Sequence, residues 1–367
     1  MLRRDFMRLS ASAALTGCIA PHAAGSERPE RSRAREVPWL KEIQQPHKGV
    51  SGSNPQLSPL RVDAEGRAIE SLADWKQKRA LIRERWLNFI GPLPGNPDPP
   101  QSEVIEEDRP TGVIRQLVEY EGEPGMIVQG YLIKPRYHDG PLPGVLTLHS
   151  TTDNTIEQPA GVRGAPEKAF GLKLAQLGCV TFSPMNFLWV DKGGRSYEEQ
   201  AEQFNKRHPD AKGMAKMLFD ASRGLDVLQH LSMVDGNRLG VMGHSLGAKE
   251  ALYLAAFDER VKAAVSSEGG ISTGFSNWDA PWYLSEQIRD FGHDHHELLG
   301  LIAPRPFLLV GGDSADGSKS WPFIEEALSV YELYGKPCST GLFNHEEGHS
   351  VPQVAELRSY QWMLNYV

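Results

Sequence analysis

The feature that most restricts the fold of this chain is the pentapeptide GHSLG at Gly243–Gly247. A short apolar run, 238–242, comes before it, and a run of strong helix formers, 248–256, comes after it. Glycines two residues before and after a serine allow a turn that is too sharp for a Cβ atom. Between a strand and a helix, such a turn lifts the hydroxyl of Ser245 above the sheet, where it can act as a nucleophile. The alternative is a tight structural turn without chemistry.

The composition excludes several classes of protein. Of the 367 residues, 40% are hydrophobic and 23% are charged, which is typical of a globular protein. The net charge of -8 argues against a nucleic-acid partner. Three cysteines are too few for a disulfide scaffold, and spacing alone does not support a bridge between Cys179 and Cys338. Nothing in the sequence specifies an oligomeric state.

The first residues predict export. The sequence LRRDFMR at 2–8 resembles a twin-arginine signal, and the weakly apolar stretch 9–16 follows it. The sequence LTGC at 15–18 resembles a bacterial lipobox, which would make Cys18 the lipidated first residue. We therefore expect 1–18 to be a signal and the protein to be periplasmic or anchored to a bacterial membrane by lipid. The alternative is a cytoplasmic protein with a basic start.

Three regions follow the signal. Residues 19–37 are rich in charged and small residues and are expected to form a flexible tether. Residues 38–100 form an N-terminal extension with extended segments and a helix at Ser71–Ile90, which Ser71 can cap and Gly91-Pro92 ends. Residues 101–367 alternate between strands and helices. This alternation predicts an α/β-hydrolase fold, with a mostly parallel, doubly wound sheet and helices on both faces.

The elements expected within this domain follow its apolar runs. The expected strands are 113–120, 126–134, 144–149, 179–183, 238–242, 261–267, 307–310 and 340–343. The expected helices are 170–177, 214–231, 297–302, 321–334 and a last one from about 354.

Ser245 needs a general base within hydrogen-bond reach. In this fold the chain order is serine, acid, histidine, so the base should follow the last strand. His345 and His349 both stand there. We favour His349, because Gly348 before it allows a loop that reaches back over the elbow. His345 is interpreted as a residue at the rim of the site.

Three carboxylates are candidates for the acid that orients the histidine. Asp313 and Asp316 follow the strand 307–310, and Glu268 follows the preceding strand. Each can fix the tautomer of the histidine from its place. The aspartates can also be turn residues only, and Glu268 can be a buried partner of Lys249. From the residues alone the alternatives stay open.

Two backbone amides are expected to hold the oxyanion of the intermediate. The amide of Leu246 lies at the N-terminus of the helix that follows the serine. A second amide should come from Ser150, Thr151 or Thr152, in the loop after the strand that ends at His149. His149 itself is placed among the substrate-contacting residues.

Two further clusters have more than one interpretation. The histidines of His293–His296 resemble a metal cluster, but adjacent residues on an incipient helix do not converge on one ion. We expect a junction between a loop and a helix, with no metal. Trp278 and Trp282 lie in the insertion after Glu268, which should roof the site. They can stack on sugar rings or form the packed core of a lid.

From about residue 70 to its end, the chain resembles bacterial α/β-hydrolases of the acetyl xylan esterase and dienelactone-hydrolase-like group. The resemblance rests on the helix with Trp75 and Trp86, on the elbow, on LHSTT at 148–152 and on 294–306. The last stretch and the helix 321–334 also look like glucuronoyl esterases.

The resemblance to glucuronoyl esterases implies roles for two residues. Bacterial members carry an acid after the strand that follows the elbow, and Glu268 occupies that place. A lysine that contacts the uronate sugar is matched by Lys249. The family also carries an arginine directly after the serine, where this chain has Leu246. The resemblance therefore implies a general esterase and leaves specificity for glucuronate esters open.

The predicted function is an exported serine carboxylesterase that removes an ester group, such as acetyl, from a carbohydrate. Ser245 attacks, His349 moves the proton, and Glu268 or Asp316 orients the histidine. No metal or organic cofactor is required. The alternatives are a glucuronoyl-type esterase, a prolyl-oligopeptidase-like peptidase and a non-catalytic glycan-binding lipoprotein. A peptidase of that type usually needs a propeller domain, for which the region before the first strands is too short.

Overall fold

The computed structural model describes residues 36–46, 57–92, 100–335 and 337–367. The predicted signal with Cys18 and nearly all of the predicted tether lie outside the described residues. The residues from Glu36 to Val367 cluster into a single unit, so the described part of the N-terminal extension packs into the same body as the hydrolase domain. Within the described residues, no helix is both long and apolar enough to span a membrane.

The strands are β1 (Ser102–Asp108), β2 (Val113–Glu121), β3 (Ile127–Pro135), β4 (Leu142–Leu148), β5 (Val180–Pro184), β6 (Val234–His244), β7 (Val261–Ser267), β8 (Phe307–Gly311) and β9 (Thr340–Asn344). The α-helices are α1 (Leu40–Ile43), α2 (Leu72–Ile90), α3 (Phe170–Gln176), α4 (Tyr197–Arg207), α5 (Gly213–His230), α6 (Leu246–Phe257), α7 (His296–Ile302), α8 (Trp321–Leu333) and α9 (Gln353–Tyr366). Every strand and helix named in the sequence analysis is present within a few residues. The strand β1 and the helices α1 and α4 were not predicted.

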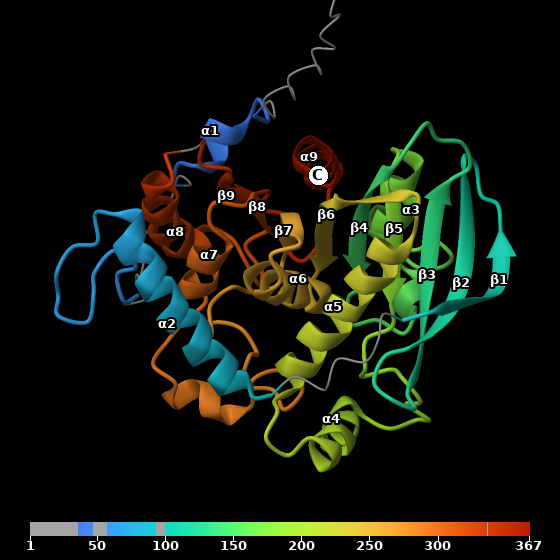
Figure 1. The fold of residues 1–367 in the computed structure, drawn as a ribbon, viewed down its shortest axis with the longest axis horizontal. Coiled ribbons are helices and arrows are strands. Elements are labelled where there is room, and N and C mark those ends of the chain that lie inside the picture. The colour runs from blue at the N-terminus through green and yellow to red at the C-terminus, as the bar shows by residue number, and fades with distance from the viewer. Residues whose placement is uncertain (1–35, 47–56, 93–99, 336) are drawn as a thin grey trace, which may run out of the picture. The chain divides into compact units, whose positions relative to one another are not determined.

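In the described part of the chain, the strands form one sheet in the order β1-β2-β3-β5-β4-β6-β7-β8-β9 (Figure 1). The strands from β4 to β9 pair in parallel. An antiparallel meander, β1-β2-β3, forms one edge and pairs with β5. This topology confirms the predicted α/β-hydrolase fold. It also places the carboxyl ends of the six parallel strands at the same end of the sheet, where such folds bind ligands.

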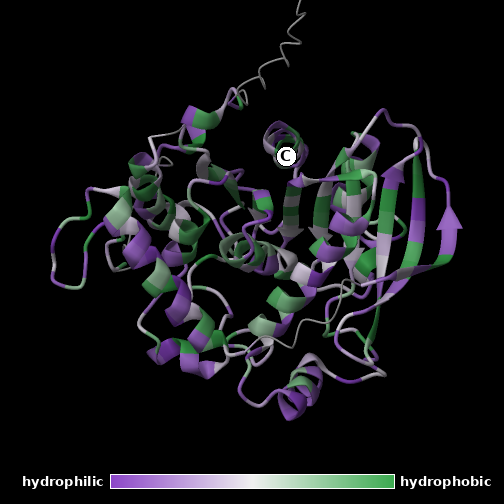
Figure 2. Ribbon diagram, viewed as in Figure 1, coloured by the Kyte–Doolittle hydropathy of each residue, from purple (hydrophilic) through white to green (hydrophobic). Residues whose placement is uncertain are grey.

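Each face of the sheet has its own apolar core. On one face, α5 and α6 pack with Leu146 and Val241, and on the other, α3 and α9 pack with Val145 and Met242. Successive residues of β4 and β6 therefore point into opposite cores, as the pleat of a strand requires. The central strands are apolar along most of their length, which Figure 2 shows in green. The doubly covered sheet is thereby a rigid base for the loops at its edge.

Helix α2 attaches the N-terminal extension to this body. The hydroxyl of Ser71 accepts a hydrogen bond from the amide of Asp74 at 3.2 Å, so the predicted cap is present. Trp75 and Trp86 are fully buried, and Nε1 of Trp86 donates to Glu297 of α7 at 2.7 Å. Leu81 of this helix is exposed and belongs to neither of the two cores.

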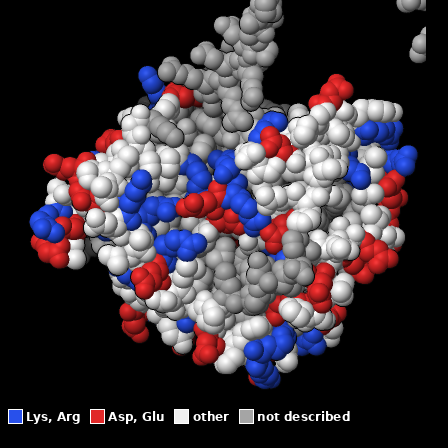
Figure 3. All heavy atoms as spheres, in the orientation of Figure 1, with Lys and Arg blue, Asp and Glu red and all other residues white. Residues whose placement is uncertain are grey.

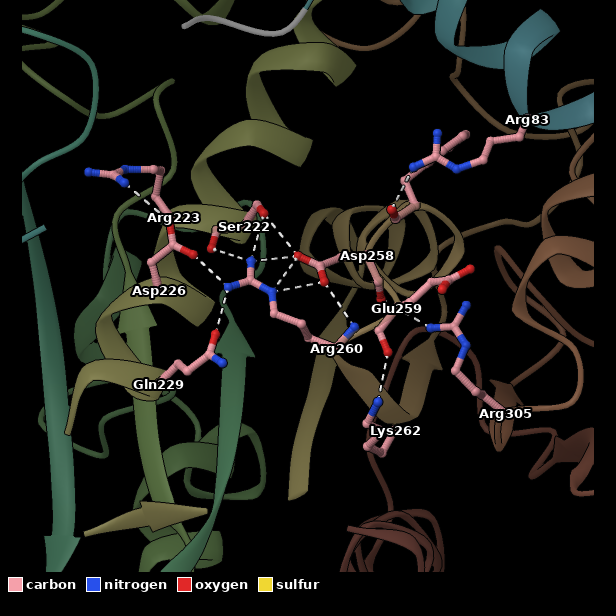
Figure 4. Close-up of polar contacts among 11 residues, drawn as sticks. Arg83, Ser222, Arg223, Asp226, Gln229, Asp258, Glu259, Arg260, Lys262 and Arg305 are labelled. Atoms are coloured by element: carbon pink, nitrogen blue, oxygen red, sulfur yellow. Dashed lines mark hydrogen bonds and ion pairs between the residues drawn. The ribbon is translucent and has the colours of Figure 1, made fainter. Parts of the chain in front are cut away.

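Acidic and basic side chains lie next to each other across the face seen in Figure 3. Figure 4 shows one such cluster, in which Arg260 joins α5 to the turn between α6 and β7. Its guanidinium donates to Asp226 at 2.6 Å, to Asp258 at 2.7 Å and to the hydroxyl of Ser222 at 3.0 Å. The cluster lies at the amino end of β7, whereas the elbow follows the carboxyl end of β6.

We expect Arg260→Met to lower the free energy of unfolding by about 2 to 3 kcal/mol, because two partly buried carboxylates lose their shared partner. Urea unfolding measures this change. Arg289→Met is the matched control, since Arg289 is exposed and pairs with the exposed Asp279. Surface pairs of this kind contribute about 0 to 1 kcal/mol. Equal losses in the two variants would contradict a structural role for the Arg260 cluster.

Candidate active site

The predicted nucleophile, Ser245, lies between β6 and α6 in a conformation that few residues adopt. Its φ of 60° and ψ of -116° are outside the regions open to most side chains, a strain of roughly 1 to 3 kcal/mol. A Cβ atom on Gly243 would lie 2.1 Å from the carbonyl oxygen of Gly247, and one on Gly247 would lie 2.3 Å from that of Leu148. Both glycines are therefore required by the sharpness of the turn.

His349 lies beside the elbow and is hydrogen-bonded to Glu268. Its Nδ1 is 3.1 Å from Oε2 of Glu268, and its ring packs on His244 with centroids 4.7 Å apart. A proton on Nδ1 that is donated to the carboxylate leaves Nε2 free to exchange a proton with a substrate or with Ser245. The side chain of His349 is 43% exposed, so it is accessible from the edge of the sheet.

Glu268 is held rigidly at the end of β7. It is 1% exposed, with a positive φ of 53°. Its carboxylate accepts hydrogen bonds from the amides of Gly312 and Ala315, the second at 2.7 Å. Since two backbone amides of the loop after β8 fix this carboxylate, its orientation toward His349 does not depend on flexible side chains.

The two candidate aspartates bind other groups. Asp316 is fully buried and accepts hydrogen bonds from the amides of Gly270 at 2.6 Å and Ile271 at 2.8 Å. Burial raises the pKa of this carboxyl above its usual value. Asp313 accepts from the amide of Ser318 at 2.9 Å. Of the three carboxylates considered from the sequence, only Glu268 has a hydrogen bond to His349.

His345 lies in the same loop as His349, but its ring forms a hydrogen bond within that loop. Its Nδ1 accepts from the amide of Glu347 at 3.1 Å, and burial lowers its pKa. Gly348 has a φ of 69° and donates its amide to the carbonyl of Gly312 at 2.7 Å. This glycine lets the loop after β9 meet the loop after β8 and present His349.

The predicted oxyanion donors lie on two adjoining segments. Leu246 is the first residue of α6, so its amide has no acceptor within the helix. The close approach of Gly247 to the carbonyls of Leu148 and His149 places the loop after β4 against this helix end. We define residues 149–151 as the oxyanion loop.

Side chains from two other segments contact this loop. The amide of Ser150 donates to Oε1 of Gln158 at 3.4 Å, and the ring of Trp189 packs on His149 with centroids 4.9 Å apart. The amide of Thr151 is therefore better placed than that of Ser150 to serve a substrate. Thr152 begins the next turn, where its carbonyl accepts from Thr155.

His149 is not placed to contact a substrate. It is 3% exposed, and both ring nitrogens are used: Nδ1 donates to the carbonyl of Ser150 at 2.8 Å, and Nε2 accepts from the amide of Asn186 at 3.1 Å. Burial lowers its pKa to about 4, so the ring is neutral near pH 7. The ring thereby holds the carbonyl of Ser150 in the oxyanion loop.

Lys249, one turn after the elbow, is 4% exposed. Its Nζ donates to the hydroxyl of Ser276 at 2.8 Å and lies 3.8 Å from the centre of the Trp278 ring. The carboxylate of Glu268 is occupied by other donors, so the alternative of a Glu268–Lys249 pair is not realised. Burial lowers the pKa of Lys249 to about 7.

Of the two predicted tryptophans, Trp278 is fully buried and donates its Nε1 to the carbonyl of Gly270 at 2.7 Å. It therefore belongs to the packed interior of the insertion. Trp282 is half-buried and packs edge-on against Tyr197, with centroids 5.9 Å apart. Of the two rings, only that of Trp282 is accessible to a ligand.

We expect Lys249→Met to raise the free energy of unfolding more at about pH 6 than at about pH 9.5. Between its folded pKa of about 7 and its ordinary value of 10.5, the unfolded chain binds more protons, so the contribution of this lysine to stability rises with pH. Below pH 7 the ammonium is charged in both states, and its desolvation opposes folding fully. Urea unfolding at both pH values measures the difference. Lys206→Met, at an exposed site, should show none, and an equal effect of Lys249→Met at both values would contradict the buried ammonium.

The histidines at 293–296 do not converge. His295 is bonded to the carbonyl of Ile271 and the hydroxyl of Tyr253, His293 to Glu297, and His296 to the carbonyl of Ser58. The segment is the predicted junction into α7. Among the described residues, no group of three or more His, Cys, Asp or Glu side chains could hold a metal ion.

Cys179 and Cys338 are both free cysteines.

Several residues around the site were not identified from the sequence. Ser276 binds Lys249, Asn186 binds His149, and Gln158 binds the amide of Ser150. Each comes from a loop after a different strand, and none belongs to a motif. Only the general rule that ligand-binding residues follow the carboxyl ends of parallel strands could have indicated these loops.

Comparisons with known proteins agree with this fold. Residues 128–281 match the model of the Dienelactone hydrolase family. The chain is 27% identical over 305 residues to a Bacillus subtilis (strain 168) protein named as a hydrolase, YtaP, an alignment that covers 79% of this chain and 100% of that protein. It is 23% identical over 326 residues to a 4-O-methyl-glucuronoyl methylesterase of Phanerochaete carnosa (strain HHB-10118-sp), covering 76% and 72% of the two chains.

Solved structures show the same fold. A glucuronoyl esterase from Solibacter usitatus matches with a TM-score of 0.67 at 17% identity, over 85% of this chain and 97% of that chain. The resemblance expected from the sequence, to α/β-hydrolases of the dienelactone-hydrolase-like group and to glucuronoyl esterases, is confirmed.

Proposed function

We propose that this α/β-hydrolase is a serine carboxylesterase that acts on an ester of a carbohydrate, with Ser245, His349 and Glu268 as its catalytic triad. The observation that carries the proposal is the hydrogen bond of 3.1 Å between His349 and a Glu268 carboxylate fixed by two backbone amides, beside a serine held in an elbow. This is the arrangement that makes a serine hydroxyl nucleophilic.

The proposed reaction has two halves. Oγ of Ser245 attacks the ester carbonyl while Nε2 of His349 takes its proton, and Glu268 stabilises the imidazolium that forms. The amides of Leu246 and Thr151 donate to the oxyanion. The intermediate collapses when His349 returns the proton to the departing alcohol. Water, activated by the same histidine, then releases the acid from Ser245.

The carbohydrate class rests on the surroundings of Lys249. This ammonium has a serine hydroxyl and aromatic rings as neighbours, so it retains donor capacity for sugar hydroxyls. The fungal relative named above is a 4-O-methyl-glucuronoyl methylesterase, which favours a uronate ester as substrate. Leu246 supplies no charged side chain to a uronate, which favours a neutral acyl group such as acetyl. We propose a sugar ester as the substrate. An acetylated sugar and a uronate ester are the two kinds of ester to be compared.

A substrate panel tests this function. The purified protein is incubated with p-nitrophenyl acetate, acetylated xylan and a methyl ester of glucuronate, beside Lys249→Met. We expect hydrolysis of at least one sugar ester, and a rise in KM of about 10-fold or more for that substrate in Lys249→Met, from the loss of one charged hydrogen bond. The KM for p-nitrophenyl acetate, which has no sugar, should change little. Hydrolysis of p-nitrophenyl acetate alone would contradict the carbohydrate substrate.

We also propose that the protein is exported and anchored by lipid at Cys18. The proposal rests on the twin-arginine-like and lipobox-like sequences of the first residues. Fractionation of bacteria that express the full chain tests it. The chain should sediment with membranes, and Cys18→Ser should move it to the soluble periplasm; recovery of the unaltered chain from the cytoplasm would contradict export.

A further inference from the structure

Glu250 is a buried acidic residue that the proposed reaction does not use. It follows Lys249 on α6 and is 5% exposed. Burial raises the pKa of this carboxyl to about 8, so it is mostly protonated near pH 7. A neutral carboxylic acid so near the elbow places no negative charge beside the developing oxyanion.

A continuous chain of hydrogen bonds leads from Glu250 to the oxyanion loop. Nδ2 of Asn186 donates to Oε1 of Glu250. The backbone amide of Asn186 donates to Nε2 of His149 at 3.1 Å. Nδ1 of His149 then donates to the carbonyl of Ser150 at 2.8 Å. All four residues are buried, so water does not compete for these bonds.

Each link fixes the direction of the next. Oδ1 of Asn186 accepts from the amide of Leu188 at 2.9 Å, which sets the amide orientation that points Nδ2 at Glu250. These bonds fix the position of Asn186. Because its backbone N–H donates to Nε2 of His149, the proton of the neutral ring must be on Nδ1. That proton holds the carbonyl of Ser150, and the Ser150–Thr151 peptide group carries both this carbonyl and the amide of Thr151. A rotation of the peptide group would turn both away together.

We propose that Glu250 and Asn186 are positioning residues that act through His149 to aim the Thr151 amide at the oxyanion. The inference rests on the proposed function, since it assigns a support to the proposed oxyanion loop. A misplacement of an oxyanion donor by 1 Å is enough to lower a rate by about 100-fold. The structure thus assigns a role in the rate of the reaction to a carboxyl that touches no reacting atom.

The test compares Glu250→Met with Glu250→Gln. Methionine has a similar length and no strong acceptor, whereas glutamine keeps an oxygen for Asn186 and has no charge. We expect Glu250→Met to lower kcat for p-nitrophenyl acetate by about 10- to 100-fold with less than about a 3-fold change in KM. Glu250→Gln should restore kcat to within about 3-fold of the unaltered protein. Glu297→Met, which removes a buried carboxylate bound to Trp86 and Arg85, controls for lost stability and should keep kcat.

Asn186→Ala provides a second route if Glu250→Met does not fold. It should show the same fall in kcat, and combining it with Glu250→Met should add little, because both changes break one chain. Unchanged kcat in folded Glu250→Met or Asn186→Ala would overturn the inference, as would independent losses that multiply. The unaltered protein separates the two proposals. If it has no Ser245-dependent activity, the proposed function fails and the inference with it; if it is active and these variants equal it, the inference alone fails.

Discussion

Ser245→Ala is expected to lower kcat for p-nitrophenyl acetate by at least about 1,000-fold, and more if the oxyanion donors contribute little without the nucleophile. The hydroxyl is the only group of the protein that forms a bond to the acyl group in the proposed mechanism. Alanine fits the elbow without new contacts, so circular dichroism and the Tm should change little. Spectrophotometric release of p-nitrophenol measures the loss.

A matched pair of histidines controls this prediction. His349→Ala should approach the loss seen for Ser245→Ala, because a triad acts as a unit. His345→Ala should remain within about 10-fold of the unaltered enzyme, since the ring of His345 is bonded to its own loop. Equal losses for the two histidines, or full activity in Ser245→Ala, would contradict the assignment of the triad.

Glu268→Gln is the second change with a large expected effect. We expect kcat to fall by about 100- to 10,000-fold, because an amide can neither stabilise the imidazolium nor enforce the tautomer of His349. Glutamine keeps the size of the side chain, but Gly312 and Ala315 donate to different oxygens of Glu268, so glutamine can accept from only one of them. The Tm checks that the variant is folded, and steady-state kinetics on p-nitrophenyl acetate then measure the catalytic loss.

Asp316→Asn distinguishes the two candidate acids. Asp316 accepts hydrogen bonds from Gly270 and Ile271, so its replacement should lower the free energy of unfolding by about 1 to 3 kcal/mol. We expect kcat of the folded protein to fall by less than about 10-fold. The reverse pattern, with a large loss of kcat in Asp316→Asn and a small one in Glu268→Gln, would make Asp316 the acid.

The elbow and most of the fold could be predicted because their signals are local. A glycine pair around Ser245 and the apolar runs that flank it are constraints within one short segment. The parallel order of the strands follows from the alternation of strands and helices. The same local reasoning favoured His349, because Gly348 precedes it. It missed α4, which has an amphipathic pattern and a capping box at Ser196 that the sequence analysis did not consider.

The surroundings of the site depend on contacts between distant segments. Glu268, Asp316 and, less strongly, Asp313 stayed open as the acid from the residues alone, and the hydrogen bonds of the loops after β7 and β8 distinguish Glu268 from Asp316. Trp278 and His149 looked accessible from their places after strands, yet both are buried by residues from other loops. No pattern in the sequence specifies such partners, because each pair joins residues far apart along the chain.

The way Asp316 holds the insertion after Glu268 has a consequence for how this enzyme can diversify. Within the insertion, the aspartate binds the backbone amides of Gly270 and Ile271, and outside it the hydroxyl of Ser320. The exposed side chains of the insertion, such as Asn277 and Glu286, can thus vary while the base of the segment stays fixed, whereas the buried Trp278 belongs to the constant part. Related chains could acquire new substrate preferences by changing such exposed positions, and protein engineers could do the same without disturbing Glu268.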